Sequence, residues 1–254
     1  MSSLPVFFAG QLEPEGTETI LDGPEGRHAA TVRRLRPGER LVLTDGRGGQ
    51  AACEVLQTGR DRLRLQVLCR QTAPAPVLRV TLAQALIKGE RGELAVELAT
   101  EAGVDAVLPW RASRCVAHWQ EGPRAAKALS RWRETARQAA KQARRAWFPE
   151  VFEPVDTTML GQRCTAAAGC LVLHEAATES LAAVPLPAEG ELVLVVGPEG
   201  GITDAELATL IAAGGRPVRL GPEVLRSSSA GIVALSVIGA LSGRWPTPIR
   251  WYVE

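Results

Sequence analysis

The sequence predicts an α/β protein with a small β-barrel at its N-terminal end. Three observations support this fold class. Short alternating apolar runs separated by glycine turns fill residues 1–72, strand and helix patterns alternate through residues 73–254, and two glycine-bearing turns each follow a strand and precede a helix. Alternating strands and helices favour a parallel sheet covered by helices. We therefore expect two domains, residues 1–72 and residues 73–254.

Composition narrows the class of protein further. The chain has 254 residues and a net charge of +1, and its first residues, MSSLPVFF, lack the basic start of a secretory signal. No apolar run approaches the roughly 18 residues that a membrane span needs. The five cysteines include no C-x-x-C pair. We therefore expect a cytoplasmic protein with reduced cysteines, no membrane partner and no metal site.

The N-terminal part reads as a compact set of strands. Runs at residues 40–44, 50–56 and 62–68 are separated by Asp45-Gly46, Gly48-Gly49 and Gly59, which are typical hairpin signals. The Pro/Ala stretch at residues 71–76 favours an extended linker, and we place the domain boundary there. A strand at 77–85, a helix at 92–103 and a strand at 104–109 then predict a βαβ unit.

A strongly basic helix is expected at residues 124–147. Residues 73–149 hold 13 basic and 7 acidic side chains. At about 100° per residue, one face of this helix is apolar, including Trp132 and Trp147, while the other carries Glu134 as its only acid. Eight bases share that face: Arg124, Lys127, Arg131, Arg133, Arg137, Lys141, Arg144 and Arg145. Such a face is either a solvated surface or, because like charges repel, a phosphate-binding surface; the excess of bases favours the second.

Residues 191–245 carry the two glycine-bearing turns. A strand at 192–196 runs into GPEGG, and Thr203 with Glu206 fits a capping box for the helix that follows. A strand at 217–220 leads to a second turn at Gly221-Pro222, after which the Ser227–Ser229 run offers N-cap hydroxyls to an apolar helix at about 230–241. Glycine turns at strand ends serve structure alone or bind a small ligand, and two in succession favour a ligand. Neither G-x-G-x-x-G nor a P-loop is present.

These turns resemble a known family. The string GPEGGITDAE followed by RLGPEVLRSSSAG is similar to the C-terminal signature of SPOUT-class RNA methyltransferases, in particular the family that methylates N3 of a uridine in the 16S ribosomal RNA of the small subunit. Upstream segments agree across nearly the whole chain, among them residues 28–34, ELATEAGV at 97–104, Ser113-Arg114 and Leu173-His174-Glu175. Ser228 departs from the pattern, because the family commonly has an acidic residue there.

The resemblance implies a PUA-like or OB-like RNA-binding barrel followed by a SPOUT domain with a C-terminal trefoil knot. It also implies S-adenosylmethionine as cofactor, a homodimer, and small-subunit ribosomal RNA or the assembled subunit as substrate. The implied cofactor-binding residues are Leu173, His174, Glu175, Gly197, Pro198, Glu199, Gly200, Gly201, Ile202, Leu220, Gly221, Leu225, Ser227, Ser229 and Ala230. A metal role for His174 is not expected, because it sits in no metal-like spacing.

Substrate and catalytic residues complete the expectation. Arg226 is the candidate that stabilises charge on the substrate, and Glu199 is the alternative as a general base or as a residue that only complements the following helix. The expected RNA-binding residues are His28, Arg33, Arg34, Arg114, Arg124, Lys127, Arg131, Lys141 and Arg145. Two other function classes stay open: a SPOUT enzyme acting on a ribose 2′-hydroxyl or another base, and a non-catalytic RNA-binding module.

Overall fold

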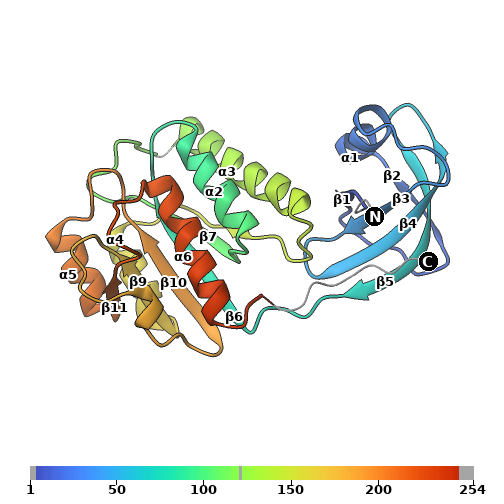
Figure 1. Cartoon of the computed structure of the whole chain (residues 1–254). Helices are drawn as coiled ribbons and strands as arrows, with labels where there is room; N and C mark the ends of the chain where they lie inside the picture. The colour runs from blue at the N-terminus through green and yellow to red at the C-terminus, as the bar shows by residue number, and fades with distance from the viewer. Residues whose placement is uncertain (1–3, 120–121, 246–254) are drawn as a thin grey trace. The chain divides into compact units, whose positions relative to one another are not determined.

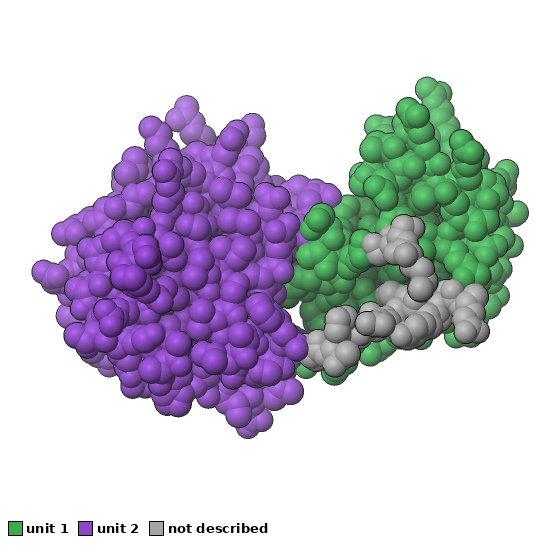
Figure 2. Space-filling model, in the orientation of Figure 1, with its two compact units in different colours: residues 1–75, 141–148, 249–254 green, residues 76–140, 149–248 purple. Residues whose placement is uncertain are grey.

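The computed structural model describes residues 4–119 and 122–245 (Figure 1). The described chain divides into two compact units, the first holding residues up to 75 together with 141–148, and the second holding residues 76–140 and 149–245 (Figure 2). The predicted boundary after Thr72 stays a prediction. The tail 246–254, for which the sequence suggested no role, lies outside the described residues.

The first unit is built on one five-stranded sheet. Its strands are β1 (Val6–Phe8), β2 (Glu18–Leu21), β3 (Arg40–Thr44), β4 (Gly49–Thr58) and β5 (Leu63–Thr72), in the order β1-β3-β4-β5-β2. All pairs are antiparallel except β1 with β3. Helix α1 (Gly23–Arg27) continues into a π-helical turn at His28–Val32. The expected strands are present, and closure of this sheet into a barrel stays a prediction.

Residues 141–148 belong to this first unit. Lys141 is buried and its Nζ lies 2.6 Å from a carboxylate oxygen of Glu25. The indole of Trp147 donates a hydrogen bond to the carbonyl of Ala73 at 3.1 Å and lies over Gly48, whose φ is +98°. A side chain at Gly48 would meet that ring at 2.7 Å, so glycine is required both for the turn and for the contact.

The second unit contains a six-stranded parallel sheet. Its strands are β6 (Leu78–Ala85), β7 (Ala106–Trp110), β8 (Glu150–Val151), β9 (Gly169–Leu173), β10 (Gly190–Val196) and β11 (Gly215–Val218), in the order β11-β9-β10-β6-β7-β8. Every neighbouring pair is parallel. In the central strands, β6 is buried at every residue except Arg79 and β10 is buried from Leu192 to Val196, as expected when both faces of a parallel sheet are covered.

Helices cover both faces of this sheet. They are α2 (Arg91–Glu101), α3 (Pro123–Gln142), α4 (Thr157–Ala166), α5 (Asp204–Ala212) and α6 (Ser227–Leu241), with a short 3₁₀ turn at Leu181–Ala183. On β6, Leu82 packs against Gly231 of α6. The hydroxyl of its neighbour Thr81 and the guanidinium of Arg163 on α4 both donate to one carboxylate oxygen of Glu191. Successive strand residues point to opposite faces, so α6 and α4 lie on opposite sides.

Two expected helices differ from the structure at their ends. The basic helix ends at Gln142 rather than at 147, because Arg144 adopts a left-handed backbone with φ of 55° and the chain enters the first unit. The last helix begins at Ser227, three residues earlier than expected, and its N-cap is Arg226 without a side-chain cap. The expected serine cap is therefore wrong. By contrast, the capping box of Thr203 and Glu206 is confirmed.

Neither a membrane-spanning helix nor a metal cluster is found in the described residues. None of the helices there is long and apolar enough to cross a membrane. The same part of the chain contains no cluster of three or more histidine, cysteine or acidic side chains that could hold a metal ion.

Candidate functional site

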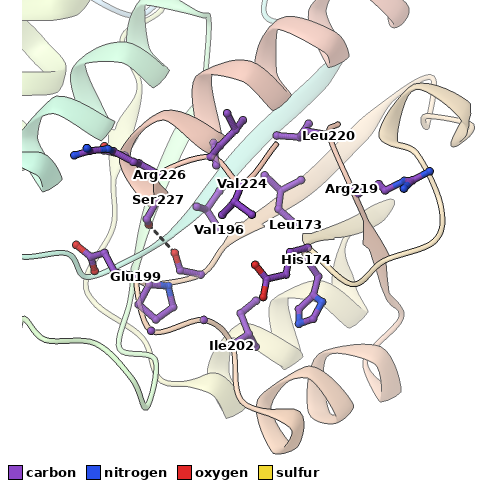
Figure 3. Close-up of a pocket in the computed structure, with 18 of the residues that line it drawn as sticks. Leu173, His174, Val196, Glu199, Ile202, Arg219, Leu220, Val224, Arg226 and Ser227 are labelled. Carbon is purple, nitrogen blue, oxygen red and sulfur yellow. Dashed lines mark hydrogen bonds between the residues drawn. The ribbon is translucent and has the colours of Figure 1, made fainter. Parts of the chain in front are cut away.

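A pocket of about 520 Å³ lies at the carboxyl ends of β9, β10 and β11 (Figure 3). Three loops form most of its wall: residues 173–175 after β9, 196–202 after β10 and 218–230 after β11. Carboxyl ends of parallel strands are the usual place for ligands in α/β sheets, since the loops diverge there and leave a crevice. The volume lies within the range of small-molecule sites, roughly 300–1,000 Å³.

The loop after β9 is fixed by its backbone. The N–H of His174 donates to the carbonyl of Val218 at 3.0 Å, which joins this loop to the end of β11. The Nδ1 atom of His174 accepts a hydrogen bond from the N–H of Ala176 at 3.2 Å, so the imidazole stabilises its own turn. These contacts leave His174 and Leu173 on the pocket wall, on the side opposite Arg226 in Figure 3.

The loop after β10 makes a tight turn around Ile202. A Cβ on Gly197 would lie 2.7 Å from the side chain of Ile202, and Gly201 has a φ of +76°. Both positions therefore require glycine. Because these glycines carry no side chains, their backbone groups line the pocket directly.

Ser227 connects the start of α6 to the ends of two strands, β10 and β6. Its hydroxyl donates to the carbonyl of Gly197 at 2.6 Å, the dashed line in Figure 3, and accepts from the amide of Gln84 at 3.0 Å. Gln84 is fully buried at the end of β6, and its Oε1 is the only buried side-chain nitrogen or oxygen without a hydrogen-bond partner among the described residues. Ser227 thus joins the start of α6 to the glycine turn and to Gln84 at the end of β6.

The pocket has an apolar part and a charged edge. Leu173, Val196, Leu220 and Val224 lie close together in Figure 3, and Ile202 lines the pocket below them. Val224 is 79% exposed. An exposed apolar side chain at a pocket is typical of a surface that a ligand covers, because its burial is favourable.

The charged edge combines a carboxylate with several guanidinium groups. Arg226 and Glu199 lie together at one side of the pocket in Figure 3, and Arg91 and Arg114 also contribute to its wall. Arg226 directly precedes the first turn of α6, where free backbone N–H groups and the helix dipole favour negative charge. The edge can thus bind or stabilise an anion while the interior holds an apolar group.

The structure brings together all but one of the expected cofactor-binding residues. Ser229 is the exception, because it is not among the lining residues and its hydroxyl instead donates to the carbonyl of Arg226 at 3.2 Å. The sequence analysis assigned no site role to several lining residues, namely Arg91, Val196, Val218, Arg219, Glu223, Val224 and Ser228. Their position directly at or after a strand end is the signal that could have found Val196, Val218 and Arg219.

The expected RNA-binding residues are divided between the two units. Arg33, Arg34, Arg124 and Lys127 are exposed. His28 packs edge-on against Phe7, with ring centroids 5.7 Å apart.

The basic face of α3 is more compensated than its sequence indicates. Arg131 pairs with Glu93 at 2.9 Å, and Arg133 pairs with Glu153 at 2.9 Å. Arg137 pairs with Glu134 within the helix. Lys141 is 7% exposed, so this ammonium lies too deep for a phosphate contact and differs from our expectation.

Two family models match the chain. Residues 73–239 match the model of the RNA methyltransferase domain family, and residues 21–68 match that of the RNA methyltransferase PUA domain. The first of these covers the whole pocket.

Curated relatives match over nearly the full chain. A Mycobacterium bovis protein named ribosomal RNA small subunit methyltransferase E is 53% identical over 94% of this chain and 93% of its own length. A Bacillus subtilis protein of the same name is 31% identical over 90% of this chain and 91% of its own.

Solved structures give the same result. A Neisseria gonorrhoeae ribosomal RNA small subunit methyltransferase E bound to S-adenosylmethionine has a TM-score of 0.84 at 28% identity, covering 94% of this chain and 98% of that one. A Legionella pneumophila methyltransferase in complex with the same cofactor has a TM-score of 0.85 at 28% identity, with the same coverage. The chain therefore belongs to the ribosomal RNA small subunit methyltransferase E family.

Proposed function

We propose that this protein transfers a methyl group from S-adenosylmethionine to N3 of a uridine in 16S ribosomal RNA. The observation that carries the proposal is the pocket at the ends of β9, β10 and β11, which gathers the residues that the family signature indicates. Family membership supports the RNA substrate, and two structural neighbours with this fold were crystallised with that cofactor. The choice of N3 of uridine rests on the family resemblance.

The lining residues fit S-adenosylmethionine. The converging apolar side chains, with exposed Val224 and Leu225 at 79% and 37%, suit a flat adenine that needs cover. The backbone of Gly197, Gly200 and Gly221 offers hydrogen-bonding groups without intervening side chains. We propose that the loops after β9, β10 and β11 hold the cofactor, which supplies an electrophilic methyl group when bound.

The substrate must be activated by this chain's own side chains. N3 of uracil carries a proton at neutral pH, so its lone pair becomes available only after the proton leaves. A side-chain base can remove the proton, or the proton can pass to water while the site stabilises the resulting anion. We propose that Arg226 does the second, because a guanidinium beside the start of α6 faces the negative charge that develops on the uracil oxygens.

Substitutions distinguish the anion-stabilising role of Arg226 from a general-base role of Glu199. We expect Arg226→Ala to bind the cofactor normally and to lose turnover by about a hundredfold or more, the scale of losing one oxyanion donor. Its residual rate should rise with pH, since more uracil ionises. Pre-steady-state rates of methyl transfer across a pH series measure both effects. If Arg226→Ala keeps full activity while Glu199→Gln loses it, a general base at Glu199 replaces the anion-stabilising role.

RNA contacts are proposed for both units. The exposed Arg124 and Lys127 on α3, the exposed Arg33 and Arg34, and Arg114 at the pocket are the side chains we expect to meet phosphates. Arg131, Arg145 and His28 remain weaker candidates. Either isolated ribosomal RNA or the assembled small subunit would present the same phosphate chemistry, and cytoplasmic location follows from either substrate.

A homodimer and a trefoil knot complete the proposal. Helix α6 is apolar on nearly all sides and packs on α2, β6, β10 and the 3₁₀ turn at Leu181–Ala183. Val233 and Leu241 of the same helix are 38% and 54% exposed, which favours a second apolar partner. Light scattering at micromolar concentration should return twice the mass of the chain, and a monomer mass would contradict the dimer.

We also propose that the loops around the pocket are threaded as a trefoil knot. The boundary between the two domains is proposed to lie after Thr72.

A further inference from the structure

A buried carboxylate outside the pocket holds the segment that follows β7. Glu206, on α5, is 5% exposed and is not among the lining residues. Its Oε1 accepts hydrogen bonds from the N–H and the hydroxyl of Ser113, at 2.7 and 3.0 Å, and from the hydroxyl of Thr157 at 3.3 Å. Its Oε2 accepts from the N–H and the hydroxyl of Thr203 at 3.0 and 2.7 Å. One side chain therefore joins three segments.

The residue after Ser113 carries this connection to the pocket. Arg114 donates from Nη1 to the carbonyl of Gly200 at 3.0 Å. A Cβ on Gly200 would lie 3.0 Å from the Cβ and 3.2 Å from the carbonyl oxygen of Arg114, so the two segments pack without room between them. Arg114 is itself exposed and lines the pocket. A shift of Ser113 would thus move a guanidinium at the pocket edge.

We infer that Glu206 is a positioning residue that holds Arg114 at the pocket edge for contact with a phosphate of the substrate RNA. The inference rests on the proposed function. A guanidinium has five N–H donors, and the bond to Gly200 uses one of them, which orients the group and leaves others for a phosphate.

The contacts favour a carboxylate at this position. All five groups around the two oxygens donate, and one group on each side is a backbone N–H that cannot accept. Glutamine has the same shape, but its NH₂ would face one of these N–H groups, so that hydrogen bond would be lost. The segment of Ser113 or the start of α5 would then be released from its place.

A double-mutant cycle tests whether Glu206 acts through Arg114. The assay is methyl transfer from S-adenosylmethionine to small subunits purified from cells that lack this protein. We expect Arg114→Ala and Glu206→Gln each to lower kcat/KM, by up to about a hundredfold, the loss that a misplacement of about 1 Å can cause. The double variant should be no worse than Arg114→Ala alone, because a misplaced segment costs nothing once its guanidinium is gone.

Controls separate positioning from a purely structural role. Thr203→Ala removes a capping hydroxyl of α5 but leaves Ser113 in place, so it should lower Tm while kcat/KM stays unchanged. If Glu206→Gln does not fold, Ser113→Ala removes one bond only, and its smaller loss should likewise vanish beside Arg114→Ala. Losses that multiply in the double variant overturn the inference, as does a Glu206→Gln enzyme whose only defect is a weaker affinity for the cofactor.

Failure of the proposed function has a different signature. A wild-type protein that transfers no methyl group to the subunits contradicts that function. The same cycle is then measured on the affinity for ribosomal RNA, where the coupling between Glu206 and Arg114 should persist. Independent effects on that affinity overturn the inference as well.

Discussion

At the scale of single residues, Gly200 in the turn after β10 has little space for added atoms. Gly200 faces both the pocket and the backbone of Arg114, so a branched side chain there must displace one of them. We expect Gly200→Val to weaken cofactor affinity by about tenfold or more, because overpacking costs about 1–3 kcal/mol. Titration calorimetry measures the affinity.

Gly161→Ala is the matched control. A Cβ there would meet Ala213 at 3.6 Å, an ordinary contact, on helix α4 outside the pocket. Its affinity should equal that of the wild type. An unchanged affinity in Gly200→Val, with an unchanged Tm, means that the cofactor does not bind against this turn.

Glu206 also predicts a pH dependence of stability. Burial raises the pKa of its carboxyl, but hydrogen bonds from Ser113 and Thr203 outweigh burial, and the pKa lies below its ordinary value. A depressed pKa means that the stabilisation is present at neutral pH and is lost as the pH falls through the pKa of the folded state. We expect Glu206→Gln to lose about 1.5–3 kcal/mol of unfolding free energy near pH 7, the scale of hydrogen bonds to a charged group.

Urea denaturation at several pH values measures this difference. The gap between wild type and Glu206→Gln should shrink as the pH falls, because the wild-type carboxylate becomes protonated. Thr203→Ala keeps the carboxylate and should keep most of the wild-type pH dependence. A gap that stays constant from neutral to acidic pH contradicts the role assigned to the ionised group.

At the scale of elements, α3 carries both exposed bases and bases that are paired with acids. Arg124 and Lys127 are exposed near its start, whereas Arg133 already binds Glu153 and the carbonyl of Val151. Replacing Arg124 and Lys127 together by glutamine should flatten the salt dependence of RNA binding, by roughly 0.7 in the log–log slope for each phosphate that the variant no longer binds. Filter binding over a range of salt concentrations measures the slope.

Arg133→Gln serves as the comparison on the same helix. Its guanidinium is engaged by protein acceptors, so its removal should change the slope less than removal of either exposed residue does. Equal slopes for the wild type and the Arg124/Lys127 variant mean that this part of α3 is only a solvated surface.

Sequence motifs predicted helix ends correctly where the hydrogen-bonding residues are close in sequence. Thr203 and Glu206 are three residues apart, and both bonds of their capping box form as expected. The serine run failed as a cap because a distant group, the carbonyl of Gly197, takes the hydroxyl of Ser227. Similarly, the acids that neutralise Arg131 and Arg133 lie at positions 93 and 153, so the helix pattern alone overstated its free charge.

At the scale of the whole molecule, the class of each part was predictable but the strand order was not. Alternating strands and helices indicated a parallel sheet, and all neighbouring pairs of the six-stranded sheet are parallel. The order β11-β9-β10-β6-β7-β8 depends on long-range pairing that periodicity does not encode. Residues 141–148 show the same limit, since their apolar pattern continued the helix although Trp147 packs on Gly48 in the first unit.

The candidate site was predictable because its loops carry their signals in the chain. Glycines mark the turn after β10, and the position of a residue at a strand end places it near the crevice. The sequence did not indicate Arg91, because this residue lies at the start of α2, far in sequence from the three loops. Only the fold brings it to the pocket wall.

The central claim, methylation of N3 of a uridine in small-subunit ribosomal RNA, is tested most directly by the product. Purified protein is incubated with S-adenosylmethionine and small subunits from cells that lack it, and the RNA is digested and analysed by mass spectrometry. Our account predicts one new methyl group that stays with the uracil base on fragmentation and that forms about a hundredfold more slowly with Arg226→Ala. A methyl group that stays with the ribose, one on another base, or no transfer at all would contradict it.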